Sequence, residues 1–195
     1  MADTTVVNKN NKENVSEAKP KITGSVFKAP TTTTPPTNAD AELGEGFKCC
    51  GYVSEDGITF TKSEESEPVK AWGGVVVKHL DGDFSDGFKL KYIEALNEEV
   101  LKEYHGEGAV KGTLDTGITI NVAPNMQEEK MIVVDMILNK GKVLKRTVIP
   151  RCKVTKTSDV TYVDNKTIEY EVEYSCEVGY DDGSYHKEYI KKVGA

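Results

Sequence analysis

Arginine is nearly absent from the sequence. Arg146 and Arg151 are the only two among 195 residues, and the net charge is −7. A protein that grips DNA needs a basic face that releases counterions from the phosphates, and much base readout depends on arginine. This composition therefore argues against a nucleic-acid-binding protein.

Long apolar runs are missing as well. No stretch approaches the length of about 18 apolar residues that a membrane-spanning helix requires. Residues 1–20 also lack the apolar centre of a secretory signal. We therefore expect a protein that is made in the cytoplasm and that has no membrane partner.

The sequence has no convincing catalytic or metal-binding motif. A P-loop, a GxGxxG fingerprint and a GxSxG elbow are all absent. The four cysteines contain no CxxC pair, and His79, His105 and His186 lie far apart without metal-ligand spacing. We expect no enzymatic activity, no cofactor and no metal, with Cys152 and Cys176 as buried, reduced thiols.

One acidic segment partly matches a calcium-binding loop. Asp81, Asp83 and Asp86 are spaced as Asp-x-Asp-x-x-Asp and are followed by Gly87. The spacing differs from that of an EF-hand, no glutamate closes the loop, and strand-like segments flank it. We interpret this segment as a solvated turn.

The chain divides into three parts by composition. Residues 1–21 are polar and lack periodicity, which predicts a disordered extension. Residues 22–46 are rich in threonine and proline, which favours an extended arm anchored by Val26 and Phe27, although a flexible linker fits the composition equally well. Residues 47–195 are expected to form the folded β-sandwich domain.

The domain shows the pattern of an all-β fold. We expect an antiparallel β-sandwich or barrel with one short flanking α-helix, a long inter-strand loop and the extended N-terminal arm. The helix is predicted at residues 97–106, where Asn97 can cap the first turn and Gly106 can end the last one. Its apolar stripe consists of Leu96, Val100, Leu101 and Tyr104.

Two hairpins are predicted in the second half of the chain. In the first, a turn at residues 140–141 sets Leu138 opposite Val143 and Asp135 opposite Arg146. The strand at residues 131–138 is apolar on both faces except at Asp135, so either the helix or another subunit must cover its second face.

The second hairpin is predicted from strict alternation at residues 167–178. A three-residue loop at residues 164–166 would set Val160 opposite Tyr170 and keep the apolar faces in phase. The opposite face of the strand would then be acidic. Its glutamates are Glu169, Glu171, Glu173 and Glu177.

The stretch GYVSEDGITFTKSEESEPVKAWGG, residues 51–74, is acidic and serine-rich, and it ends at the only tryptophan, Trp72. We interpret residues 54–70 as a long loop. Trp72 is expected to be its packed anchor, with Gly73 and Gly74 forming the bend where the loop rejoins the sheet.

Four segments together resemble the major tail protein of long, non-contractile-tailed bacteriophages. They are TGSVFKAPTTTTPPT, ELGEGFKCCGYVSEDGITFTKSEESEPVKAWGG, FKLKYIEALNEEVLKEYHG and MIVVDMILNKGKVLKRTVIPR. The resemblance covers about residues 22–190. It implies a structural virion protein whose hexameric rings stack into the tail tube, assembled in the host cytoplasm. DNA would pass through the tube without specific binding, and other tail proteins, such as tape measure and terminator proteins, would be partners.

The resemblance also implies that the long loop and the terminal arms reach between subunits and rings. The contact residues expected on this basis are Val26, Phe27, Ser54, Glu55, Asp56, Glu64, Glu65 and Trp72. Candidate lumen-facing residues are Glu169, Glu171, Glu173 and Glu177, provided that their strand belongs to the inner sheet; in an outer sheet they would only face solvent.

Two other classes of function remain open from the residues alone. One is a secreted or surface-attached immunoglobulin-like adhesion module, against which the missing signal peptide counts. The other is a small β-barrel ligand carrier, for which the sequence offers no evidence of a cavity.

Overall fold

The computed structural model describes residues 10–21 and 24–193. The strands are β1 (Ala18–Pro20), β2 (Val26–Ala29), β3 (Lys48–Cys49), β4 (Val53–Lys70), β5 (Val76–Tyr92), β6 (Val110–Lys111), β7 (Thr119–Ile120), β8 (Lys130–Leu138), β9 (Val143–Thr157), β10 (Tyr170–Cys176) and β11 (Lys187–Lys192). The helices are α1 (Glu98–His105) and three 3₁₀ turns, η1 (Lys12–Asn14), η2 (Glu107–Ala109) and η3 (Asn139–Gly141).

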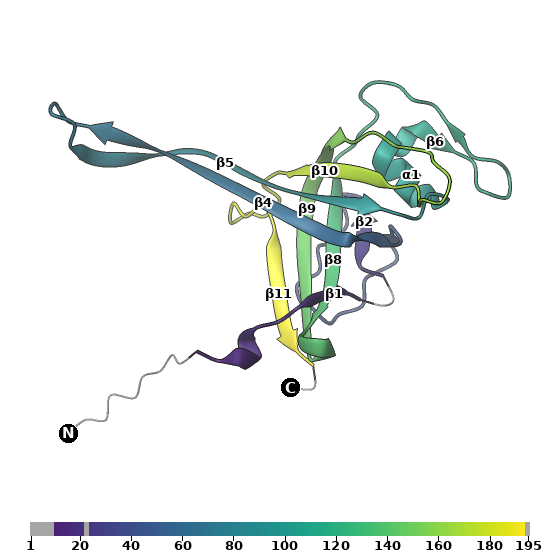
Figure 1. The fold of residues 1–195 in the computed structure, drawn as a ribbon, viewed down its shortest axis with the longest axis horizontal. Helices are drawn as coiled ribbons and strands as arrows, with labels where there is room; N and C mark the ends of the chain where they lie inside the picture. The colour runs from purple at the N-terminus through teal and green to yellow at the C-terminus, as the bar shows by residue number, and fades with distance from the viewer. Residues whose placement is uncertain (1–9, 22–23, 194–195) are drawn as a thin grey trace.

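Nine strands form one antiparallel sheet in the order β3-β2-β8-β9-β10-β5-β4, with β1 added to β8 and β11 added to β9. Strand β9 changes partners along its length: residues 143–148 pair with β11, whereas residues 152–157 pair with β10. In Figure 1, β4, β5 and β10 run across the direction of β8, β9 and β11. The all-β prediction is confirmed.

The main core lies between these two parts of the sheet. Strands β5 and β10 contribute Phe88, Leu90, Tyr92, Val172 and Tyr174, and strands β8 and β9 contribute Ile132, Val134, Ile149, Cys152 and Val154. The helix α1 covers the open end of this core with Val100 and Leu101. The burial of apolar surface in this core is the main contribution to the stability of the fold.

Strand β8 is covered on both faces, as its sequence predicts. Ile132 and Val134 face the main core, whereas Met131 and Val133 belong to a second buried cluster. That second cluster is completed by Ala29, Phe27, Leu43, Phe47, Val148 and Tyr189. The chain's own N-terminal arm therefore covers the second face of β8, so the expectation that the helix or another subunit would cover it is wrong.

The N-terminal arm is fixed by a buried ion pair. Arg146 is 1% exposed and donates from Nε and Nη2 to the carboxylate of Asp135 at 2.6 and 2.7 Å. Its remaining Nη1 donates to the backbone carbonyls of Asn38 and Ala41. The cross-strand pair of Asp135 and Arg146, predicted from the hairpin register, is confirmed.

The domain boundary expected at residue 21 does not coincide with the strand pairing. Ala18–Pro20 pairs with Met136–Leu138, so part of the expected disordered extension adds a short strand to the edge of β8. Residues 1–9, and residues 22–23 of the arm, lie outside the described residues.

The helix prediction is confirmed in its bounds. The side chain of Asn97 accepts a hydrogen bond from the Glu99 amide, and Gly106 ends the helix with φ at +102°. Val100 and Leu101 are buried, but Leu96 is 69% exposed because it precedes the cap and lies off the packed stripe. Leu96 was therefore wrongly placed in the core.

The second hairpin was predicted wrongly. Strand β10 pairs with β9, with Val172 opposite Thr157 and Tyr174 opposite Val154, so residues 158–169 form a connection without strand pairing. The alternation within β10 is confirmed, because Tyr170, Val172, Tyr174 and Cys176 are all buried. The partner strand was missed because β9 continues through Thr157 as one long element.

Cys152 and Cys176 are buried free thiols, as expected, and they lie directly opposite one another across β9 and β10. Burial raises the pKa of Cys176 to about 12 and that of Cys152 well above its ordinary value. Cys49 is exposed and its neighbour Cys50 is buried, as the alternation of a strand requires.

A buried network of ion pairs and hydrogen bonds connects α1 to the sheet. Glu103 is fully buried, and its carboxylate accepts hydrogen bonds from the Lys130 ammonium at 2.9 Å and from the Tyr174 hydroxyl at 2.5 Å. Lys28 approaches Glu103 at 3.2 Å and Glu99 at 2.8 Å. Each buried charge thus has an opposite charge within contact distance, which is the condition for keeping ions inside a protein.

This network makes stability depend on pH. Burial alone would raise the pKa of Glu99, but the ammonium groups of Lys28, Lys102 and Lys48 hold it at about 2, below its ordinary value of 4.5. The folded state therefore gains stability that is fully present above pH 4.5 and is lost as the pH falls towards 2.

We expect urea unfolding at about pH 3 to show a lower free energy of unfolding than at about pH 7, and Glu99→Gln to reduce that difference. If the difference in unfolding free energy between pH 3 and pH 7 were the same in this variant as in the wild type, Glu99 would not be the source of the pH dependence.

Candidate assembly surfaces

The segment interpreted as a long loop is one half of a β-hairpin. Strand β4 pairs with β5 from Ile58 opposite Leu90 to Lys70 opposite Val76, with register shifts near each end and in the middle. The hairpin leaves the body of the protein and projects far beyond it (Figure 1). The acidic side chains of β4 are therefore not loop residues but the solvated faces of a paired strand.

The tight turn at the tip explains the paired glycines. Gly74 donates to the carbonyl of Ala71 at 2.9 Å, and Ala71 donates to the carbonyl of Val75 at 2.8 Å. Gly73 and Gly74 have φ at +100° and +86°, a backbone conformation that side chains disfavour. The bend was thus predicted at the right residues, but it closes the far end of the hairpin and not its foot.

Trp72 lies at this tip and is 105% exposed, so its prediction as a packed anchor beside the sheet is wrong within the chain. The error arose because the strands on both sides of residues 71–75 pair with each other beyond the expected foot. Other exposed apolar side chains surround the tip. They are Val69, Val75, Val76, Val77 and Leu80.

The base of the hairpin packs against the segment that leads into β11. His186 Nδ1 lies 2.5 Å from the carboxylate of Asp86, which is buried. The rings of Phe84 and Tyr185 pack with centroids 4.8 Å apart. Asp86 belongs to the predicted solvated turn, but residues 81–86 lie within β5, so that prediction is wrong.

The remaining contact residues expected from the sequence do not gather in one patch. Val26 is fully buried in the main core and Phe27 is half-buried in the second cluster, so both stabilise the chain itself. Ser54, Glu55 and Asp56 lie where β4 begins, between the pairs Val53–Tyr92 and Ile58–Leu90, and Ser54 is buried. Glu64 and Glu65 lie in the exposed middle of the hairpin.

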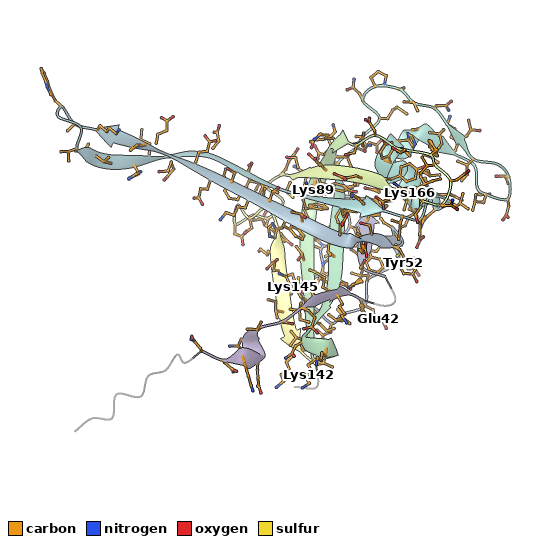
Figure 2. All side chains as sticks on the ribbon, in the orientation of Figure 1. Glu42, Tyr52, Lys89, Lys142, Lys145 and Lys166 are labelled. Carbon is orange, nitrogen blue, oxygen red and sulfur yellow. The ribbon has the colours of Figure 1, made fainter. Side chains whose placement is uncertain are left out.

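Strand β4 ends the strand order of the sheet, and within the described residues its outer edge has no partner strand. An open edge presents unpaired backbone donors and acceptors to a second chain. Many of its side chains point to solvent, as Figure 2 shows for the hairpin as a whole.

The acidic face of β10 carries lysines between its glutamates. Glu171 lies opposite Lys91, and Glu173 lies opposite Lys89 on one side and Lys156 on the other. The Lys156 ammonium approaches Glu173 at 3.1 Å, and Lys91 lies 3.8 Å from both Glu169 and Glu171. Because paired residues of neighbouring strands share a face, this surface has mixed charge and is not a ladder of one sign. Glu177 follows the end of β10 and is exposed.

Sequence reasoning missed the two polar clusters at Glu103 and at His186. A charged residue at position 103, within the turn that carries Val100 and Tyr104, was a local signal that could have indicated the first cluster. The pair of His186 and Asp86 had no local signal, because the two residues are far apart in the sequence.

Two classes of site are not found in the part of the chain that the structure describes. Residues 10–21 and 24–193 contain no group of three His, Cys, Asp or Glu side chains that could hold a metal ion. The helices of the same residues are too short or too polar to cross a bilayer.

Comparison with known proteins identifies one relationship. A family model described as "Phage tail tube protein" matches residues 10–191, nearly the whole chain. The match begins before residue 22, so it includes η1 and β1, which the resemblance by motifs had left out. A search of curated proteins finds no match.

Proposed function

The chain belongs to the phage tail tube protein family, and from this premise we propose that it polymerises as stacked hexameric rings that form the conduit for genome ejection. Its role is that of a structural protein of the tail tube. The single observation that supports stacking is the projecting β4–β5 hairpin with its exposed apolar tip.

The hairpin is long enough to reach a second subunit. At about 3.3 Å per residue, the part of β4 beyond Glu64 extends about 20 Å before the turn. Every residue from 64 to 84 is exposed, so this part is not held by the chain's own core. An exposed apolar tip on such an arm is typical of a surface that another protein covers.

The geometry of the contact favours an open polymer. The hairpin tip and the body that would receive it are different surfaces of one molecule, so the contact is head-to-tail. Such contacts continue indefinitely unless rotation closes them, and they therefore produce filaments or rings. Within the proposed tube, rings would close laterally through open strand edges and would stack through the hairpins.

We expect the purified chain to sediment as large assemblies and to form rings or tubes in electron micrographs. Sedimentation that shows only a folded monomer at high concentration would contradict the proposed function. It would instead favour a monomeric binding module, such as an immunoglobulin-like adhesion domain.

We further propose that the face of β10 with Glu169, Glu171 and Glu173 lines the channel. On this face the ammonium groups of Lys91 and Lys156 lie within 3.8 Å of glutamate carboxylates, which reduces the number of free positive charges that DNA would meet. The passing phosphates then find no basic surface that would release counterions and hold them. We expect tape measure and terminator proteins to be its further partners in the tail.

Replacing Glu169, Glu171 and Glu173 together with lysine tests the lumen assignment. The change removes the carboxylate partner of Lys156 and two of the three carboxylates near Lys91, which keeps Asp56 at 2.8 Å, and it produces a basic wall. We expect tubes to assemble and ejection to slow by about tenfold or more at low salt, with salt relieving the effect. The matched control replaces the same residues with glutamine and adds no positive charge. Unchanged ejection from the lysine variant would place this face outside the channel.

A further inference from the structure

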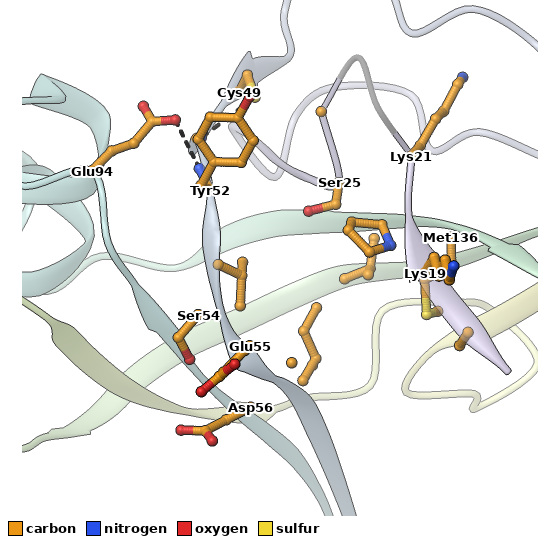
Figure 3. A pocket seen from close by; sticks show the side chains of 18 residues that line it. Lys19, Lys21, Ser25, Cys49, Tyr52, Ser54, Glu55, Asp56, Glu94 and Met136 are labelled. Carbon is orange, nitrogen blue, oxygen red and sulfur yellow. Dashed lines mark hydrogen bonds between the residues drawn. The ribbon is translucent and has the colours of Figure 1, made fainter. Parts of the chain in front are cut away.

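A pocket of about 820 Å³ lies on the body of the protein, between β1 and the beginning of β4. Its floor and walls include the apolar side chains of Pro20, Val53, Ile58, Val134 and Met136. Figure 3 shows Ser54, Glu55 and Asp56 along one wall and Lys19 and Lys21 on the opposite side. Within the described residues, the pocket is not filled by another part of the chain.

One buried polar group at this pocket lacks a partner. Ser54 is 9% exposed, and its hydroxyl makes no hydrogen bond within the described residues. A buried hydroxyl without a partner is destabilising, and serine can turn its hydroxyl by rotation about χ1. An incoming donor would therefore remove this cost.

The tip of the hairpin has the complementary properties. Trp72 offers a large apolar ring, fully exposed, and its indole N–H is a donor that normally finds an acceptor when the ring is buried. The turn itself carries no charge, and Lys70 and Lys78 flank it on the two strands. The carboxylate of Glu55 at the pocket is exposed and forms no ion pair within the described residues, so it can accept one of these ammonium groups.

We propose that the pocket between β1 and β4 receives the hairpin tip of a second copy of this chain, with Trp72 as the inserted residue. This inference rests on the proposed function and names the surface through which one ring holds the next. Tip and pocket occupy different parts of the molecule, so the contact repeats from copy to copy and the hairpin length sets the spacing between rings. Buried tryptophan is frequent among the residues that dominate binding energy at interfaces.

Trp72 is the only tryptophan of the chain, so the emission of the unmodified protein reports on the tip directly. The emission maximum is expected to shift to shorter wavelength when monomers assemble, and quenching by acrylamide is expected to fall. Trp72→Ala should raise the concentration needed for assembly by at least about tenfold. Trp72→Phe keeps most of the apolar area and should have a smaller effect. Equal assembly by wild type and Trp72→Ala would overturn the proposal.

A cross-link identifies the receiving surface. Cys49 lines the pocket and is the exposed cysteine among the four, so it can react in the native protein. In an Ala71→Cys variant, a short bis-maleimide should join neighbouring subunits and produce a ladder of multimers on a denaturing gel. The same variant with Cys49→Ser should give no ladder. Tubes that form normally without this cross-link would refute the pocket and leave the proposed function intact, whereas a wild-type chain that never assembles would refute the proposed function itself.

Discussion

Replacement of residues 64–84 by an Asn-Gly turn is expected to abolish tube formation and to leave the monomer folded. Ser63 lies opposite Ser85 in the native hairpin, and a two-residue turn of this type preserves that pairing. No buried side chain is removed, because residues 64–84 are all exposed. The free energy of unfolding should therefore change by about 1 kcal/mol or less, mainly through loss of the contact between Phe84 and Tyr185.

The matched control keeps the full hairpin and replaces the exposed Asp81 and Asp83 with asparagine. Urea unfolding measures the stability of both proteins, and electron microscopy measures assembly. The control should form tubes and the shortened protein should not. Normal tubes from the shortened protein would show that the hairpin is only a solvated projection.

Glu103→Ala is expected to destabilise the monomer by about 3–5 kcal/mol, the range measured when one partner of a buried ion pair is removed. The Lys130 ammonium would be left buried without its carboxylate, and the Tyr174 hydroxyl would lose its acceptor. Because this carboxylate connects α1 to the sheet, the midpoint temperature of thermal unfolding should fall strongly. Calorimetry or urea unfolding would measure the change.

Glu107→Ala provides the matched control. Glu107 also contacts Lys28, at 2.9 Å, but its side chain is 41% exposed, so its removal should cost about 1 kcal/mol or less. The double change Glu103→Met with Lys130→Met should recover much of the lost stability, because it removes the unpaired charge. Equal losses for Glu103→Ala and Glu107→Ala would contradict a central role for Glu103.

Local signals were sufficient for some elements of the fold. Asn97 and Gly106 define the ends of α1 through their own capping chemistry. The hairpin of β8 and β9 follows from a short turn, and its register places Asp135 opposite Arg146 as expected. These features depend on residues that are close together in the sequence.

The features that were missed depend on contacts between distant segments. The partner of β10 could not be chosen locally, because Val154 and Val160 both offered an apolar residue to its buried face. The acidic face was misjudged for the same reason: Lys89 and Lys156 come from two other strands and lie beside Glu173. Charge on a strand face is therefore a property of the sheet and not of one strand.

The hairpin illustrates a different limit of sequence interpretation. Residues 62–67 are polar on both faces, and this composition is typical of a loop. A hairpin that projects from its own domain has no core to cover, so it lacks the alternation by which strands are recognised. The exposed tip then resembles a buried anchor in sequence, because Trp72 is apolar in either role.

The arrangement of subunits within assembled tubes is the most direct test of the proposed stacking of rings through the hairpins. A helical reconstruction by electron cryomicroscopy of tubes formed from the purified chain would place every strand. We predict rings in which the β10 face with Glu171 and Glu173 lines the channel and each β4–β5 hairpin crosses to the next ring. Tubes in which the hairpins lie along the outer surface of their own ring, without contact to a neighbouring ring, would contradict the proposal that the hairpins connect the rings.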